Sequence, residues 1–249
     1  MRVTIIGCSG SYPGPDSPAS CYLVEAGGFR LVIDMGNGAL GPLQRHVGLY
    51  DVGAVLLTHH HPDHCADLCA YYVARRYRPG GQPPPIPVYG PPGTADRMAH
   101  AYGMAPNPGM HGTFGFRTLR PGRFELGPLH VRVERVNHPI ETYGVRVADG
   151  HSAMAYSADT GETPTLVDLA RDADLLLAEA SFVEGDDNPP NLHLTGRQAA
   201  EHAARAGAAR LVLTHLVPWH DPKRVLGDAH ESAYGGIVDL ANSGATYDL

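Results

Sequence analysis

The chain of 249 residues has few cysteines, a single tryptophan and no long apolar run. Its four cysteines, Cys8, Cys21, Cys65 and Cys69, match no zinc-ribbon spacing and are too few for a disulfide framework at this length. We therefore expect reduced thiols in a cytoplasmic protein. Because no apolar stretch is long enough to cross a bilayer, and the first ten residues are typical of a core strand, we expect no membrane segment.

Basic charge is also scarce. The sequence has 19 Lys and Arg against 26 Asp and Glu, a formal net charge of −7 and a pI near 6.1. Such a chain has no general attraction for polyanions, so nucleic-acid binding would need a local basic patch. The only tight basic cluster is Arg75, Arg76 and Arg78, which we interpret as a solvated helix end. Nucleic-acid binding is therefore not expected.

The length and the order of elements predict one α/β domain spanning residues 1–249. Ten apolar runs, many of them β-branched and bounded by Gly, Pro or Asp, indicate strands. They cover residues 2–7, 21–26, 29–36, 52–59, 86–90, 129–136, 143–148, 152–158, 174–181 and 210–216. This mixture of strands and helices favours sheets covered by helices in layers.

Two helices and one hairpin are the clearest local predictions. A helical pattern covers residues 64–77, and a second covers 195–207 with a capping box from Thr195 and Gln198 and a stop at Gly207. Asp149-Gly150 suits a two-residue type I′ turn between the strands at 143–148 and 152–158.

The segment "LTHHHPDHCADL", residues 57–68, carries four histidines and two aspartates directly after a buried strand. Side chains alternate along a strand, so His59 and His61 should point the same way and His60 the other way. A helix starting near Asp63 would bring Asp63 and His64 back over the strand end. The spacing H-x-H-x-D-H therefore offers ligands for two adjacent metal sites.

A solvated, histidine-rich loop is the alternative to a metal site, but it explains four histidines in six positions poorly. Imidazole and carboxylate ligands without thiolate suit zinc best, with manganese or iron as alternatives. Two such metals would lower the pKa of a shared water and stabilise negative charge on substrate oxygens, which predicts hydrolysis.

The run from Thr58 to His64 matches T-H-x-H-x-D-H and so resembles the signature of the metallo-β-lactamase superfamily. The resemblance covers nearly the whole chain and implies a four-layer αβ/βα sandwich with a dinuclear site at the sheet edges. It also implies three later ligands, supplied by "VNHP" (His138), "YSADTG" (Asp159) and "LVLTHL" (His215).

By this resemblance, one metal takes His59, His61 and His138, and Asp159 bridges to the other. The second metal takes the remaining three ligands, Asp63, His64 and His215. Asp63 would also orient the attacking hydroxide as a catalytic residue. Asp34, in "LVIDMGNG", would steer a ligating histidine from outside the metal site, although a purely structural cap role is equally open for it.

Within the superfamily, segments such as "GCSGSYPGPDSPAS", "EAS" and "LHLTGRQAAEHAARAG" look most like the RNase Z-like phosphodiesterase branch. This branch carries a catalytic histidine, and His193 matches it in this sequence. Such a histidine could contact a phosphate oxygen or donate a proton to the leaving alkoxide. The N-terminus of the helix after it would add attraction for phosphate. An ordinary exposed histidine before a helix cap is the alternative.

Two departures from RNase Z stand out. His138 and Asp159 are only 21 positions apart, which leaves no room for the long arm that grips tRNA, and "SADT" at residues 157–160 replaces the usual S-G-D-T. The chain is most similar to small cyclic nucleotide phosphodiesterases, so we expect a small anionic substrate such as a 3′,5′-cyclic nucleotide and, by analogy with RNase Z, a homodimer. A thioesterase, lactonase or β-lactamase, an enzyme of specialised metabolism and a tRNA endonuclease are the alternatives.

Overall fold

Two β-sheets of seven strands each face one another in the computed structural model, which describes residues 1–249. The first sheet is mixed, with antiparallel pairing among its N-terminal strands and parallel pairing from β3 to β6. In spatial order it contains β14 (Thr246–Asp248), β1 (Arg2–Gly7), β2 (Cys21–Ala26), β3 (Phe29–Ile33), β4 (Ala54–Leu56), β5 (Ile86–Gly90) and β6 (Phe114–Thr118).

The second sheet repeats this plan with later parts of the chain. Its strands pair antiparallel from β7 to β10 and parallel from β10 to β13. In spatial order it contains β13 (Ile237–Leu240), β12 (Arg210–Thr214), β11 (Leu175–Glu179), β10 (Ala153–Tyr156), β9 (Tyr143–Ala148), β8 (Leu129–Arg135) and β7 (Gly122–Leu126).

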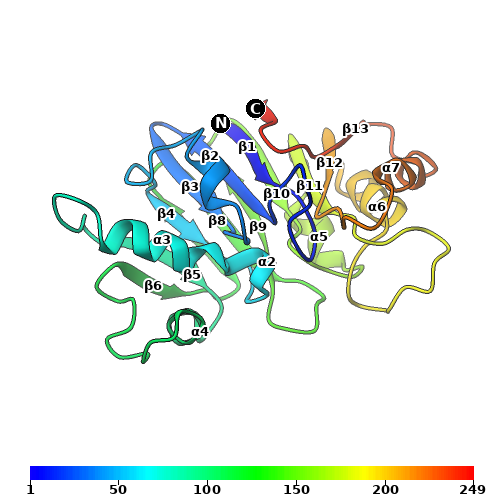
Figure 1. The fold of residues 1–249 in the computed structure, drawn as a ribbon. Coiled ribbons are helices and arrows are strands. Elements are labelled where there is room, and N and C mark those ends of the chain that lie inside the picture. The colour runs from blue at the N-terminus through cyan, green and yellow to red at the C-terminus, as the bar shows by residue number, and fades with distance from the viewer.

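Helices cover the outer face of each sheet. On the first sheet lie α1 (Leu40–Leu43), α2 (Pro62–Cys65), α3 (Asp67–Arg76) and α4 (Thr94–Tyr102). On the second lie α5 (Pro164–Leu169), α6 (Gly196–Ala206) and α7 (Pro222–His230). Figure 1 shows α3 and α4 on one side of the sheets and α6 and α7 on the other.

Three apolar clusters hold these four layers together. The largest lies between the sheets, and the other two lie between each sheet and its helices. Side chains of β4 and of the residue after it pack alternately into two of these clusters. Ala54 and Leu56 face the other sheet, while Val55 and Leu57 face the helices. The layering confirms the predicted αβ/βα sandwich.

All ten expected strands are present, although several are shorter than their apolar runs. Four further strands, β6, β7, β13 and β14, were not expected. They are short, and all four lie at the edges of their sheets, where one-sided exposure weakens the apolar pattern. Strand β14 pairs with β1, which brings the two chain ends side by side (Figure 1).

The predicted helix over residues 64–77 is divided into α2 and α3 around Ala66. The expectation of a solvated basic cluster at its end is wrong for Arg75, which is 1% exposed. Its guanidinium donates to the Pro84 carbonyl at 2.6 Å and to the Tyr71 hydroxyl at 3.3 Å. Arg75 therefore ties the Pro- and Gly-rich loop between α3 and β5 to α3.

The second predicted helix is confirmed as α6, with the capping box of Thr195 and Gln198 and with Gly207 in the left-handed conformation. The predicted two-residue turn is wrong. Strand β9 ends at Ala148 and β10 begins at Ala153, so the connection has four residues. The Asp149 carboxylate accepts the backbone N–H groups of His151 and Ser152. None of the helices combines the length and apolar character that crossing a membrane requires.

Candidate metal centre

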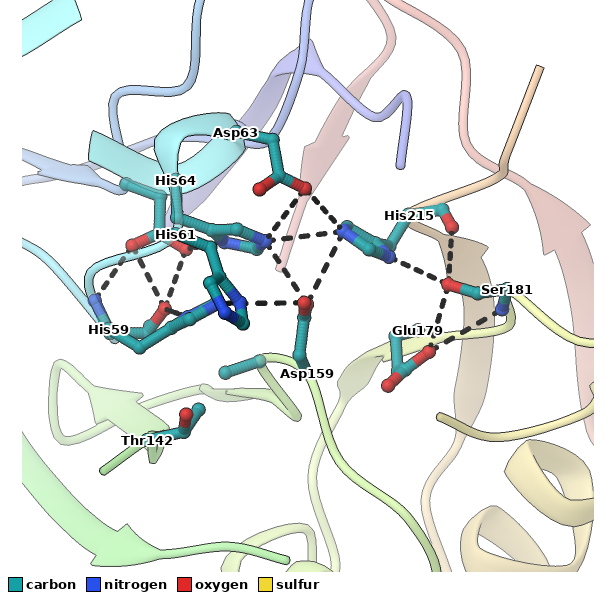
Figure 2. Close-up of polar contacts among 12 residues, drawn as sticks. His59, His61, Asp63, His64, Thr142, Asp159, Glu179, Ser181 and His215 are labelled. Carbon is teal, nitrogen blue, oxygen red and sulfur yellow. Dashed lines mark hydrogen bonds and ion pairs between the residues drawn. The ribbon is translucent and has the colours of Figure 1, made fainter. Parts of the chain in front are cut away.

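Seven side chains gather at one edge of the sandwich, where loops from both sheets meet. Four come from α2 and the connection that leads into it from β4, in the first half of the fold, and three come from loops that follow β8, β10 and β12 in the second half. Together they are His59, His61, Asp63, His64, His138, Asp159 and His215. Figure 2 shows six of these labelled side chains pointing toward one another.

The backbone after β4 explains how the histidines separate. Strand β4 ends at Leu56, and the backbone is extended at His61, where φ is −67° and ψ is 143°, directly before Pro62 at the first position of α2. His59 and His61 point into the cluster. His60 points away, as the alternation predicts. Its Nε2 lies 2.8 Å from Thr94 Oγ1 and acts as the donor, because the Thr94 hydroxyl donates to the Pro91 carbonyl.

The first group of potential ligands is His59, His61, His138 and Asp159. His61 Nδ1 lies 3.1 Å from His59 Nε2 and 3.3 Å from His138 Nε2, and Asp159 Oδ2 lies 3.5 Å from His59 Nε2. A bridge between Asn137 and Gly161 brings the loops of His138 and Asp159 together. Three imidazoles and one carboxylate oxygen thus converge on one point.

The second group is Asp63, His64, Asp159 and His215. The Nε2 atoms of His64 and His215 lie 3.2 Å apart, and Asp159 Oδ1 is 3.1 Å from the first and 3.4 Å from the second. Asp63 Oδ2 is 3.1 Å from His215 Nε2 (Figure 2). Asp159 belongs to both groups through its two oxygens, so it has the position of a bridging ligand.

In three of the histidines, the hydrogen bond of Nδ1, the ring nitrogen that faces away from the cluster, fixes the tautomer. His138 Nδ1 donates to the Leu192 carbonyl at 3.0 Å, and His64 Nδ1 donates to Asp34 Oδ2 at 2.8 Å. His59 Nδ1 lies 3.1 Å from the Thr58 hydroxyl, which itself donates to Asp34. Each of these rings therefore directs Nε2 into the cluster, where that nitrogen can bind a metal once it carries no proton.

The ring of His215 is oriented in the same way, by a hydrogen bond at Nδ1. Its Nδ1 lies 2.7 Å from the hydroxyl of Ser181, which can donate to Glu179 Oε2 at 3.1 Å and so accept from the ring. His215 itself adopts a left-handed φ of 54° directly after β12. Gly10 lies against it, since a Cβ on Gly10 would come within 2.6 Å of the His215 carbonyl oxygen. This close approach explains one glycine of the "GCSG" segment.

Charge and hydrogen bonding both suit a cation at this centre. Asp159 Oδ1 is buried and has no hydrogen-bond partner. Burial lowers the pKa of His59 to about 3, so its ring is neutral. Burial also opposes a charge on His64, but Asp159 and Asp34 outweigh it and raise the pKa of His64 well above its usual range. The buried carboxylates thus require positive charge nearby, which a bound cation would supply.

Asp34 lies outside both groups and contacts the motif from behind. It is fully buried at the end of β3 and accepts the backbone N–H of Thr58 at 2.7 Å in addition to His64 Nδ1. The Tyr156 hydroxyl donates to it at 3.3 Å. This is the position expected of a carboxylate that orients a metal-binding histidine.

Asp63 is held by the loop that follows β1. The backbone N–H of Ser11, in a left-handed conformation with φ of 64°, donates to Asp63 Oδ2 at 2.9 Å. Gly36 allows α2 to pack closely, because a Cβ there would lie 2.1 Å from the Asp63 carbonyl oxygen. Ala158, where the expected family pattern has glycine, also has a left-handed φ of 52° and leaves Asp159 in place.

His193 stands beside both groups without belonging to either of them. Its ring centroid lies 5.7 Å from that of His138 and 5.4 Å from that of His215. Its Nδ1 donates to Glu179 Oε1 at 2.9 Å. Burial alone would lower the pKa of His193, but the Glu179 carboxylate raises it to about 9. The ring is therefore a proton donor whose Nε2 is not used by Glu179.

Sequence reasoning missed Glu179. This fully buried carboxylate ends β11, and besides His193 it accepts the backbone N–H of Thr160 at 2.6 Å, next to Asp159. Through Ser181 it also supports His215. An acidic residue at the end of an otherwise apolar strand was the available signal.

The expected attraction between phosphate and the N-terminus of α6 is not supported. The capping box already satisfies the Gln198 N–H, and the Thr195 hydroxyl donates to the carboxylate of Glu184 at 3.0 Å. Gly196 packs against Val225 of α7, since a Cβ on Gly196 would lie 2.0 Å from the Val225 carbonyl oxygen. This helix end is therefore buried and capped rather than open to a ligand.

A cavity of about 390 Å³ opens beside His193. Its lining includes Ser11, Ser181 and Phe182 near the centre, and Trp219 farther out. A larger hollow of about 670 Å³ lies over β7, β8, β9 and the end of α5, and it contains none of the seven clustered residues. None of the seven lines the smaller cavity either, but Ser11 contacts Asp63 and Ser181 contacts His215, so the smaller cavity adjoins the cluster and the larger one does not.

Comparisons with known proteins identify relatives of the whole chain. A family model described as the β-lactamase superfamily domain matches residues 29–216. An uncharacterised protein of Mycobacterium leprae is 42% identical over the whole chain and 89% of its own length. A ribonuclease Z of Myxococcus xanthus is 30% identical over the whole chain and 98% of its own length.

A solved structure shows the same fold. The metallo-β-lactamase-fold protein YhfI of Bacillus subtilis, named a probable metallo-hydrolase, superposes with a TM-score of 0.87 at 27% identity. The superposition covers 99% of this chain and 98% of that one.

Proposed function

Because this chain belongs to the β-lactamase superfamily of metallo-hydrolases, we propose that it hydrolyses a small phosphodiester, such as a 3′,5′-cyclic nucleotide, at the metal centre. The observation that carries this proposal is the pair of His193 and Glu179 beside the two ligand groups. A phosphodiester with an alkoxide leaving group needs a proton donor at that oxygen, and His193 is such a donor.

The seven clustered residues fit two divalent cations, for which zinc is the proposed identity. His59, His61 and His138 would hold one, Asp63, His64 and His215 the other, and Asp159 would bridge them. When bound, such a pair activates water near neutral pH and neutralises charge on the phosphoryl oxygens.

Three side chains orient the attacking water and protonate the leaving group: Asp63, His193 and Glu179. Asp63, fixed by the Ser11 N–H, is placed to accept a hydrogen bond from the attacking water and orient it. As the new P–O bond forms, the ester P–O bond breaks, and the Nε2 proton of His193 passes to the departing oxygen. Glu179 accepts from Nδ1 of the same ring, so it stabilises the imidazolium and fixes its direction.

A small substrate is favoured over tRNA for two reasons. RNase Z is expected to carry its long arm between the residues that match His138 and Asp159. In this chain the connection between β9 and β10, which lies in that interval, has only four residues. No Lys or Arg lines the cavity beside His193, whereas a polynucleotide usually needs a basic track.

Release of p-nitrophenol from bis(p-nitrophenyl) phosphate would test the proposal. We expect turnover by protein loaded with zinc or manganese, with two equivalents of metal per chain by elemental analysis. The Asp63→Ala variant is the matched control and should lose this activity. Protein that holds two metals and cleaves no phosphodiester would contradict the proposal and favour ester, thioester or lactam substrates.

Product analysis separates the substrate class from the chemistry. Loss of 3′,5′-cyclic nucleotide with appearance of the linear monophosphate would support the finer proposal. Cleavage of aryl diesters without any cyclic nucleotide turnover would restrict the function to another small diester.

A further inference from the structure

The cavity beside His193 is lined unlike an ordinary phosphate site. Its walls carry two aromatic rings, Phe182 and Trp219, and two carboxylates, Asp186 and Asp187, with no basic residue other than histidine. Phe182 packs edge-on against His193, with ring centroids 5.1 Å apart. An arriving substrate would therefore meet apolar and acidic surface immediately beyond the proton donor.

Trp219 is the residue that needs an explanation. It is 59% exposed, although a large aromatic ring gains most by being buried. Tyr12, 47% exposed on the loop after β1, packs against it with ring centroids 5.7 Å apart and an interplanar angle of 34°. Trp219 lines the cavity and Tyr12 does not. Tyr12 therefore supports the Trp219 ring by packing against it.

The local backbone holds this pair in place. The Ser9 hydroxyl donates to the Tyr12 carbonyl at 2.7 Å, and the Tyr12 N–H donates to the Gly10 carbonyl at 2.7 Å. The His220 N–H donates to the Val217 carbonyl at 3.1 Å, which closes a turn around Trp219. The ring is therefore presented by ordered turns that begin directly beside Ser11 and His215.

We propose that Trp219 is the stacking platform of a nucleobase subsite, which receives the base of the substrate when its phosphodiester lies at the metal centre. The two rings touch, so the base would stack on the cavity face of Trp219 rather than insert between Trp219 and Tyr12. An uncharged base suits such an acidic wall, whereas a further phosphate would be repelled by Asp187; the other carboxylate, Asp186, is paired with Arg224 at 3.6 Å. This inference rests on the proposed function and adds the substrate moiety that gives specificity.

The chain offers a direct binding readout, because Trp219 is its only tryptophan. Metal-loaded protein excited at its indole band is titrated with adenosine 5′-monophosphate and, in parallel, with ribose 5-phosphate, which lacks the base. We expect saturable quenching by the nucleotide and little by the sugar phosphate. Equal quenching by both ligands, or none by the nucleotide, would overturn the subsite.

Kinetics tests the same subsite through catalysis. Thymidine 5′-(p-nitrophenyl phosphate) and methyl p-nitrophenyl phosphate share the scissile bond and the leaving group and differ in the nucleoside. Trp219→Ala should lower the ratio of kcat/KM for the thymidine ester over the methyl ester roughly tenfold, mainly through KM. Trp219→Phe should restore most of the ratio.

Tyr77→Ala is the matched control, because Tyr77 is a 63% exposed ring outside the cavity, and it should leave the ratio unchanged. A Trp219→Ala ratio equal to that of the parent would refute the subsite while leaving the hydrolase proposal intact. Saturable nucleotide quenching by a protein that cleaves neither ester would instead refute the phosphodiesterase proposal and support the subsite.

Discussion

Asp34 offers a sharp test of how the metal centre is built. Its carboxylate is fully buried and accepts from the Thr58 N–H at 2.7 Å and from His64 Nδ1 at 2.8 Å. The Thr58 and Tyr156 hydroxyls also donate to it, but a hydroxyl can rotate, so the Asp34→Ala variant chiefly leaves these two N–H groups buried without an acceptor. At about 1–3 kcal/mol for each orphaned group, the metal-free protein should lose roughly 2–6 kcal/mol of unfolding free energy.

Metal binding should weaken as well, because His64 would lose the partner that directs its Nε2 lone pair. Loss of such an outer partner typically costs roughly 10- to 100-fold in metal affinity. Competition with a chromophoric chelator measures that change, and denaturant unfolding of metal-free protein measures the stability. Asp67→Asn is the control, since Asp67 accepts only the Leu40 N–H at 2.7 Å and contacts no clustered residue. Unchanged metal affinity in Asp34→Ala would refute the reasoning.

Three further predictions follow from single contacts. His60→Ala should keep two metal equivalents by elemental analysis, while His61→Ala should lose one; the reverse pattern would show that the alternation is misassigned. Glu179→Gln should move the alkaline limb of kcat/KM for a cyclic nucleotide to lower pH, because the pKa of His193 falls and the donor loses its proton earlier; an unmoved limb would remove Glu179 from this role. Thr195→Ala should lower the unfolding free energy by about 1 kcal/mol through loss of the α6 cap, and an unchanged denaturation midpoint would contradict it.

The sequence predicted the layers of the fold because its central strands are buried on both faces and therefore read as continuous apolar runs. Edge strands carry no such signal: β14 has three residues and forms only by pairing with β1 from the other end of the chain. The break at Ala66 was invisible as well, since residues 64–77 share one helical pattern across it.

The site, too, was predictable from the sequence only in part. His59, His61, Asp63 and His64 lie close together in sequence, so backbone alternation and a following helix were enough to group them. His138, Asp159 and His215 needed the family resemblance, because only the tertiary fold brings their loops together. Glu179 was missed because its role depends on a contact with His193 across 14 residues. The α6 N-terminus was misjudged because its burial depends on α7.

The most direct test of the central claim compares two leaving groups in metal-loaded parent and His193→Ala protein. A 3′,5′-cyclic nucleotide releases an alkoxide that must be protonated, whereas bis(p-nitrophenyl) phosphate releases a p-nitrophenolate that is stable without a proton. We expect His193→Ala to reduce kcat for the cyclic nucleotide roughly 100- to 10,000-fold and to reduce it far less for the aryl diester. Equal losses on both substrates, or no loss on the cyclic nucleotide, would contradict the assignment of His193 as the proton donor of a phosphodiesterase.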